Sequence, residues 1–206
     1  MKVALLTTEF PPRVVGEVSN LVDFVAREVS RAGNEVHVIT FDDWKPGTET
    51  RGGIKIHRVT NRVASHLNPF TWVSTLSCEF IRVFSDLVWD SGGCDLIHAF
   101  EWSTALSSIP LKDSLDIPYV QSFSSVEELR SRANLTLFGQ TVKWIESVST
   151  SLADAVIAHS DQTFRAVRAL YPWCTEKLHL LDVGHESERI NLLKIYKEVV
   201  SENANG

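Results

Sequence analysis

The sequence of 206 residues has few cysteines, and those it has are far apart. Cys78, Cys94 and Cys174 form no Cys-x-x-Cys pair, so the sequence predicts neither a disulfide framework nor a zinc site. No group of histidine, cysteine and acidic residues has the spacing of metal ligands either. We therefore expect reduced, buried thiols, no metal and no cofactor.

Long apolar runs and dense basic clusters are also missing. No apolar segment approaches the ~20 residues that a membrane-spanning helix needs, and the first residues follow a strand pattern instead of a signal peptide. The net charge is −6, and without a cluster of lysine and arginine the chain has no electrostatic footprint for nucleic acid or an anionic membrane surface. These absences predict a cytoplasmic protein with no membrane span and no nucleic-acid partner.

What the sequence does contain is a regular alternation of strand-like and helix-like segments. Most of the strand-like segments are continuous apolar runs, as in strands buried on both faces of a parallel sheet. The seven predicted strands cover residues 2–7, 35–40, 54–59, 95–99, 119–123, 155–158 and 177–181. This order is typical of a doubly wound α/β sheet. We expect one Rossmann-like domain with a single, mostly parallel sheet of about seven strands and helices on both faces.

Two of the helices are marked by apolar periodicity. One apolar stripe runs over residues 18–32 and is followed by Gly33, and a longer one covers residues 73–88 and is followed by Gly92. Glycine is placed to end both helices, because it adopts the left-handed conformation that follows many helix termini. The longest predicted loops are residues 41–53 and 61–68.

The segment after the first strand occupies the place where α/β sheets of this kind usually bind a ligand. Residues 7–20 read TTEFPPRVVGEVSN and hold one glycine, Gly16, so they lack the Gly-x-Gly-x-x-Gly pattern of a dinucleotide site. Asp42 and Asp43 end the second strand, where an acid could bind a ribose, but a solvated turn is the stronger interpretation. Arg13, beside the N-terminus of the following helix, predicts weak binding of phosphate or sulfate.

Five segments along the chain also share one known pattern. They read MKVALLTTEFPPRVVGEVSNLVDFVAREVSRAGNEVHVIT, CDLIHAFEWSTAL, IPYVQSFSSVEEL, ADAVIAHSDQ and EKLHLLDVGHE. In this order, and over nearly the whole chain, they resemble the N-terminal domain of GT-B-fold retaining glycosyltransferases of the glycogen synthase and sucrose-phosphate synthase kind. The resemblance implies that residues 1–185 form the Rossmann-like N-terminal domain of such an enzyme.

The segments depart from that family pattern at positions that bear on catalysis. In the family a Gly-Gly loop approaches the donor phosphates, and here Val15 stands in place of its first glycine. The family histidine near the reacting sugar aligns with Ser124, whose hydroxyl lacks the reach and charge of an imidazole. The resemblance therefore implies that no catalytic residue remains at Val15 or Ser124. The candidate ligand-binding residues that it leaves are Arg13, Gly16, His98, Glu101 and Trp102, the last three from a degenerate form of the family motif His-x-His-Asp-Trp.

Each of the last three candidates also has a structural interpretation. His98 at a strand end is more often a hydrogen-bonded core residue than a catalyst, and Glu101 could cap the helix that follows. Trp102 could stack on a sugar, but the chain has six tryptophans, so packing is the stronger interpretation. The run His-Ser-Asp at residues 159–161 does not predict a hydrolase triad, because adjacent residues of one strand end point in different directions.

The C-terminal segment resembles the last helix of the full-length enzymes, which crosses back onto the N-terminal domain. It reads ESERINLLKIYKEVV, and its residues Ile190, Leu193, Tyr196 and Val200 fall on one helical face. We expect residues 186–201 to form this returning helix and residues 202–206 to be a tail. We also expect the donor-binding domain, which family members carry before that helix, to be absent.

Three functions from different classes remain open. The one we favour is a stand-alone, catalytically inactive glycosyltransferase-like domain that binds a partner, a glycan or a phosphate group. The second is the acceptor-side subunit of a split glycosyltransferase with a separately encoded donor domain, and the third is another small-ligand protein that shares only the fold. Six apolar residues, expected at the strand ends and expected to be covered by a second copy or another chain, are Phe10, Val14, Val15, Phe100, Trp102 and Phe123.

Overall fold

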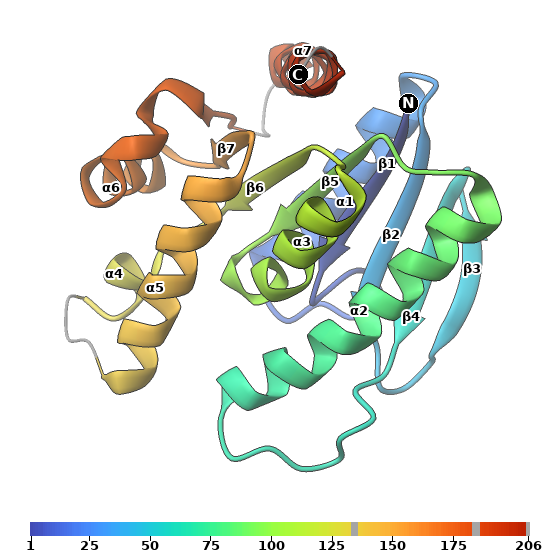
Figure 1. Cartoon of the computed structure of the whole chain (residues 1–206), viewed down its shortest axis with the longest axis horizontal. Helices are drawn as coiled ribbons and strands as arrows, with labels where there is room; N and C mark the ends of the chain where they lie inside the picture. The colour runs from blue at the N-terminus through green and yellow to red at the C-terminus, as the bar shows by residue number, and fades with distance from the viewer. Residues whose placement is uncertain (133–135, 183–185, 205–206) are drawn as a thin grey trace.

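The centre of the molecule is a single eight-stranded sheet, seen in a computed structural model that describes residues 1–132, 136–182 and 186–204, the side chains of 186–189 excepted. The strand order is β3-β4-β2-β1-β5-β6-β7-β8, and all neighbours pair in parallel except β3 and β4 (Figure 1). The strands are β1 (Lys2–Thr7), β2 (Glu35–Phe41), β3 (Gly47–Arg51), β4 (Ile54–Val59), β5 (Leu96–Phe100), β6 (Tyr119–Phe123), β7 (Ala155–Ala158) and β8 (Leu178–Leu180). The predicted Rossmann-like α/β fold is confirmed, with one strand more than expected.

The additional strand is β3, which lies inside residues 41–53, a segment that the sequence predicts to be a loop. Its sequence GTETR is polar and fully exposed, so it carries no apolar signal. It pairs with β4 as an antiparallel hairpin at the edge of the sheet. The turn between them is Gly52-Gly53, with φ of 58° and 84°, a conformation that glycine adopts without strain. The glycine turn and the backbone pairing with β4 therefore form this strand, without any buried side chain.

Helices cover both faces of the sheet. They are α1 (Glu17–Arg31), α2 (Pro69–Ser91), α3 (Trp102–Leu115), α4 (Glu127–Arg130), α5 (Leu137–Leu152), α6 (Asp161–Leu170) and α7 (Glu186–Asn203), with a short 3-10 helix, η1 (Pro172–Lys177), before β8. Helices α1 and α7 pack on the face that holds Val3 and Leu5, and α2 and α3 pack on the face that holds Ala4 and Leu6 (Figure 1). Successive residues of β1 thus enter opposite halves of the core, as expected for a strand buried on both sides.

The predicted ends of the first two helices are confirmed. Helix α1 ends at Arg31 and is followed by Gly33 with φ of 82°. Helix α2 ends at Ser91, and its C-cap Gly92 is left-handed with φ of 74°. At its other end, the side chain of Asn68 accepts a hydrogen bond from the backbone of the third helical residue, which begins the helix as a capping box.

Helix α7 packs on the same face as α1. Its buried residues are Leu192, Ile195, Tyr196 and Val199, which follow the spacing i, i+3, i+4 and i+7 of one helical face. Ile190, which the sequence analysis places on the apolar face, is 64% exposed, so the buried face is rotated from the predicted one. The helix ends at Asn203 instead of residue 201, and the expected boundary at residue 185 falls outside the described residues. No helix within the described ranges is long and apolar enough to cross a bilayer.

Candidate functional site

A pocket of about 640 Å³ lies at the carboxyl ends of β6 and β7, the edge where sheets of this type bind ligands. Its walls come from the first half of α1, from the residues that follow β6 and β7, and from the start of α6. We call it the strand-end pocket, and its lining residues are Glu17, Asn20, Leu21, Phe24, Ser124, Ser125, Leu129, His159, Ser160, Gln162 and Thr163. Among the predicted site residues, all of which the structure describes, only Ser124 lines it.

The loop after β1 is closed by a carboxylate of its own. Glu9 is 8% exposed, and its Oε2 accepts hydrogen bonds from the backbone N–H groups of Val15 and Gly16, both at 2.7 Å. N–H groups at the start of a helix are the ones that hold a phosphate in nucleotide-binding loops. Here an internal anion occupies them. The sequence analysis missed Glu9, although an acidic residue directly before this loop is a signal that could have found it.

Arg13 faces away from the start of α1. Its guanidinium carbon lies 4.8 Å from the centre of the Phe41 ring, and its Nη1 donates a hydrogen bond to the carbonyl of Thr8. Its Nε lies 4.0 Å from a carboxylate oxygen of Asp43. Arg13 therefore has its partners away from the N–H groups of Val15 and Gly16, which Glu9 holds, and weak phosphate binding by Arg13 stays a prediction.

Asp42 forms a buried turn after β2, not the solvated one that the sequence analysis favours. It is 4% exposed, and its Oδ1 accepts hydrogen bonds from the backbone of Trp44 and Lys45 at 3.0 Å. Its Oδ2 lies 3.3 Å from Nη1 of Arg58, a buried residue of β4 that also donates to the carbonyl of Pro11 at 2.6 Å. These bonds tie the loop after β1 to the end of β2, so Asp42 has a structural role.

Glu101 combines a strained backbone with a mostly buried carboxylate. Its φ of 65° and ψ of 167° lie in a region that only glycine normally populates. The carboxylate does not cap α3; its Oε1 accepts from the backbone and the hydroxyl of Ser124, at 2.6 and 2.7 Å, and its Oε2 lies 3.3 Å from Arg130. Burial raises the pKa of Glu101, and the bonds from Ser124 and the charge of Arg130 oppose this effect. The network joins the end of β5 to the end of β6.

Arg130, from the short helix α4, is surrounded by carboxylates. Besides Glu101 it contacts Glu127 at 3.2 Å and the fully buried Glu146 of α5 at 2.7 Å. Burial raises the pKa of Glu146, whose Oε2 also accepts a hydrogen bond from the hydroxyl of Tyr171 at 2.9 Å. The sequence analysis missed this cluster, because its members come from segments that only the folded chain brings together.

His98 is a core residue in the structure. It is fully buried, its Nε2 lies 2.6 Å from the hydroxyl of Ser122 on β6, and its Nδ1 contacts the hydroxyl of Tyr196 on α7. Burial lowers the pKa of the imidazole well below its usual value, which keeps the ring neutral. Both ring nitrogens have protein partners, so His98 is placed to join α7 to the sheet and not to contact a ligand.

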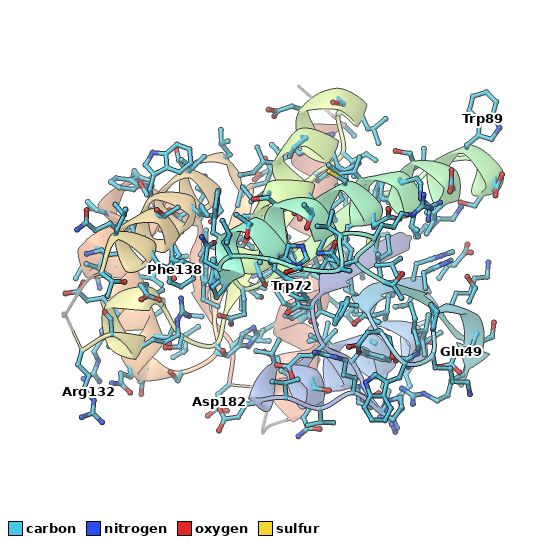
Figure 2. The ribbon with its side chains drawn as sticks, turned by 90° about the horizontal axis from the view of Figure 1, so that it is seen from below. Glu49, Trp72, Trp89, Arg132, Phe138 and Asp182 are labelled. Atoms are coloured by element: carbon cyan, nitrogen blue, oxygen red, sulfur yellow. The ribbon has the colours of Figure 1, made fainter. Side chains whose placement is uncertain are left out.

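The aromatic residues are distributed differently from the expectation. Trp102 is half-buried and meets Phe138 edge to face, with ring centres 5.8 Å apart. Trp72 packs against the core and meets Phe41 edge to face, whereas Trp44 is 91% exposed, and Figure 2 shows Trp89 standing clear of the ribbon at the end of α2. Of the six apolar residues expected on an exposed strand-end face, Phe10, Phe100 and Phe123 are buried in the core of the chain itself. That face therefore needs no partner to cover these three rings.

His159 and Ser160 stand at the end of β7 on the wall of the strand-end pocket. Burial lowers the pKa of His159 to about 4, so the ring is neutral at pH 7, and its Nδ1 donates a hydrogen bond to the carbonyl of Leu181 at 3.1 Å. The hydroxyl of Ser160 accepts from the backbone of Thr163 and begins α6 as its N-cap. The Nε2 of His159 is buried and has no hydrogen-bond partner among the described residues, and the absence of a triad stays a prediction.

The groups around the strand-end pocket can bind and orient a polar ligand. They are hydroxyls, side-chain amides, a neutral imidazole and one carboxylate, that of Glu17. In the part of the chain that the structure describes, no three or more histidine, cysteine, aspartate or glutamate side chains are placed to hold a metal ion. The altered hinge motif at residues 183–185 lies outside the described residues.

Two sequence relatives and one solved enzyme are similar to this chain. An uncharacterised glycosyltransferase of Methanocaldococcus jannaschii is 30% identical over 184 residues, which are 89% of this chain and 46% of that protein. An alpha-maltose-1-phosphate synthase of Mycobacterium tuberculosis is 28% identical over 195 residues, 91% of this chain and 46% of that protein. The sucrose-phosphate synthase of Thermosynechococcus elongatus has a TM-score of 0.69 at 17% identity, over 87% of this chain and 47% of that chain.

The family and the extent of the match follow from these comparisons. A piece of the same sucrose-phosphate synthase, made of two separate segments of its chain, has a TM-score of 0.68 at 17% identity, and the match covers 95% of this chain and 97% of that piece. The chain spans about half the length of the curated relatives that it matches. The sequence model of Glycosyltransferase Family 4 matches residues 18–189, and because this is most of the sequence, the chain belongs to glycosyltransferase family 4.

Proposed function

We propose that residues 1–206 form a glycosyltransferase family 4 half that binds a saccharide or a partner and does not transfer a sugar by itself. The observation that carries this proposal is that the charged groups predicted at the site already have partners within the chain. Arg13 is stacked on Phe41, and the carboxylate of Glu101 is bound by Ser124 and Arg130. What stays open at the strand-end pocket is a surface of uncharged polar and apolar groups with one carboxylate, that of Glu17.

The chemistry of sugar transfer supports the same conclusion. Charge develops on the leaving phosphate and on the sugar ring, and a group that stabilises this charge must be aimed at it before the reaction. Losing one such group commonly costs ~10² to 10³ in rate. At the two positions that the family resemblance marks, Val15 is 73% exposed and apolar, and the hydroxyl of Ser124 donates to Glu101.

The test is a transfer assay with the purified chain. It is incubated with UDP-, ADP- and GDP-sugars and with glucose, maltose or a glucan as acceptor, and the release of nucleotide is followed. We expect no release above the hydrolytic blank, including in the double variant Val15→Gly with Ser124→His. Turnover that is lost in Glu101→Ala but kept in Gln140→Ala, an exposed position on α5, would contradict the proposal.

A second candidate function is the acceptor-side half of an active enzyme whose donor-binding half is supplied separately. The observation that favours it is the backbone of Glu101, since strained conformations of this kind persist mainly at functional sites. The expected division, with residues 1–185 as the N-terminal domain and α7 as the returning helix, is supported by the likeness to the two-segment piece of sucrose-phosphate synthase. Turnover that appears when the donor-binding half of a family relative is added, and disappears in Glu101→Ala, would favour this candidate.

A further inference from the structure

We infer that the strand-end pocket accepts a neutral saccharide and rejects its phosphorylated form. This inference rests on the proposed function of the chain as a saccharide-binding half, and it names the charge class of the ligand. It follows from the distribution of charge around the pocket.

The lining itself offers neutral hydrogen-bonding groups. Asn20 and Gln162 provide side-chain amides and Ser125 a hydroxyl, all of which can both donate and accept, whereas the hydroxyls of Ser124 and Thr163 already donate within the protein. Sugar hydroxyls also donate and accept, so the two sets of groups match. The one charged side chain among the described lining residues is the carboxylate of Glu17, and no lysine or arginine is among them.

Part of the hydrogen-bonding capacity of the two helix starts at the pocket is used within the protein. At the start of α1, the N–H groups of Val15 and Gly16 both bind the carboxylate of Glu9. At the start of α6, the N–H of Thr163 binds the hydroxyl of Ser160 at 3.1 Å. At the start of α1 two carboxylates, those of Glu9 and Glu17, already lie in the favourable field of the helix N-terminus and would repel a phosphate.

Two arginines at this edge of the sheet are committed to other partners. Arg130 contacts the carboxylates of Glu101, Glu127 and Glu146 at 3.3, 3.2 and 2.7 Å. Arg13 is stacked on Phe41 at the end of β2. A phosphate could recruit Arg130 only by separating it from buried carboxylates, and an unpaired buried carboxylate is strongly unfavourable. His159 adds no positive charge either, because burial lowers its pKa to about 4.

The inference can be tested by direct binding. The full chain is titrated with glucose and maltose and, in parallel, with glucose 1-phosphate and glucose 6-phosphate, and the dissociation constants are measured by calorimetry or by NMR shifts. We expect the phosphorylated sugars to bind about tenfold more weakly than the neutral ones, or not at all. Gln162→Ala should weaken binding of the neutral sugar several-fold, whereas Gln140→Ala, on the exposed side of α5, should not.

A charge-introducing variant makes the test sharper. Gln162 is exposed, so Gln162→Arg is expected to fold, and it should improve binding of the sugar phosphates while leaving that of glucose little changed. If sugar phosphates bind the original chain as tightly as their parent sugars, the inference is wrong and the proposed function survives. If neutral sugars bind but Gln162→Ala has no effect, the assignment to this pocket is wrong. If no sugar binds at tens of millimolar, both the inference and the saccharide-binding function are wrong.

Discussion

The loops after β1 and β5 each contain a glutamate that binds backbone N–H groups, and the two loops differ in what that bond holds. Glu9 closes a loop in which Gly16 has an extended backbone with φ of −145°. Glu101 sits in a conformation that glycine prefers, with φ of 65°, and reaches across to Ser124 on the next strand end. The first carboxylate binds N–H groups of its own loop, whereas the second links two strand ends.

The loop after β1 is held by bonds within itself, whereas the loop after β5 depends on residues from other segments. A residue held in a glycine-only region costs of order 1–3 kcal/mol, and it persists only when its surroundings over-determine it. For Glu101 those surroundings are Ser124 and Arg130, and Arg130 is fixed in turn by Glu127 and Glu146. Glu9 needs no such second layer, because its two partners lie in its own loop.

The largest effect is expected from breaking the layer behind Glu101. Arg130→Met leaves the carboxylate of Glu146 buried without its cation, and such a change typically costs about 3–5 kcal/mol of unfolding free energy. Urea denaturation followed by circular dichroism measures it. The matched control is Arg82→Met, because Arg82 also binds two carboxylates but on the exposed surface of α2, where ion pairs contribute about 0–1 kcal/mol.

A double variant separates the loss of charge pairing from a general defect. Arg130→Met with Glu146→Gln removes the unpaired charge, so it should recover part of the lost stability. Equal losses of unfolding free energy in Arg130→Met and Arg82→Met would show that the carboxylates around Arg130 do not stabilise the conformation of Glu101.

A smaller effect is expected from opening the first loop. Glu9→Ala removes the acceptor of two backbone N–H groups, and leaving such groups without a partner costs about 1–3 kcal/mol. The same change frees the start of α1 for an external anion. Sulfate should therefore raise the melting temperature of Glu9→Ala more than that of the original chain. An equal response of the two proteins to sulfate would show that Glu9 does not occupy an anion site.

The smallest effect on stability is expected from the outer strands, and it depends on pH. His57 on β4 contacts His37 on β2 with ring nitrogens 3.0 Å apart, and burial lowers the pKa of His57 to about 4. The unfolded chain therefore takes up the proton first, so stability is lost as the pH falls from 6.5 towards 4. We expect on the order of 1 kcal/mol from His57 between pH 7 and pH 5. Denaturation at both pH values should show a smaller loss in His57→Gln.

The carboxylate of Glu146 should affect the pH dependence of stability in the opposite direction. Burial raises the pKa of Glu146 in the folded chain, so its contribution to stability is lost as the pH rises and regained on acidification. Glu146→Gln should therefore make the loss of stability at low pH steeper. A shallower loss in that variant would contradict the assigned direction of the shift.

The strands were predictable where burial dictated their composition. Ala155–Ala158 and Tyr119–Phe123 lie in the middle of a parallel sheet, so both faces are apolar and the segments are found within a residue of their ends. Gly47–Arg51 is exposed at the sheet edge, where backbone pairing and polar contacts such as that of Glu49 with Arg58 hold it, so its side chains carry no apolar pattern. For the site, the family resemblance indicated Ser124 and Glu101, but the partners of Arg130 are 3 to 29 residues away in the chain, and no local pattern marks them.

The sequence by itself determined the fold class, the order of most strands and helices, and the family, because these depend on apolar periodicity and on motifs read along the chain. Only the tertiary structure decided which polar groups are free. It placed Glu9 on the helix start, turned Arg13 towards Phe41, buried His98 against Tyr196 and surrounded Arg130 with carboxylates. The physical reason is that the availability of a charged or hydrogen-bonding group depends on which partners the packed chain brings within about 3 Å, and that distance is set by contacts between segments remote in sequence.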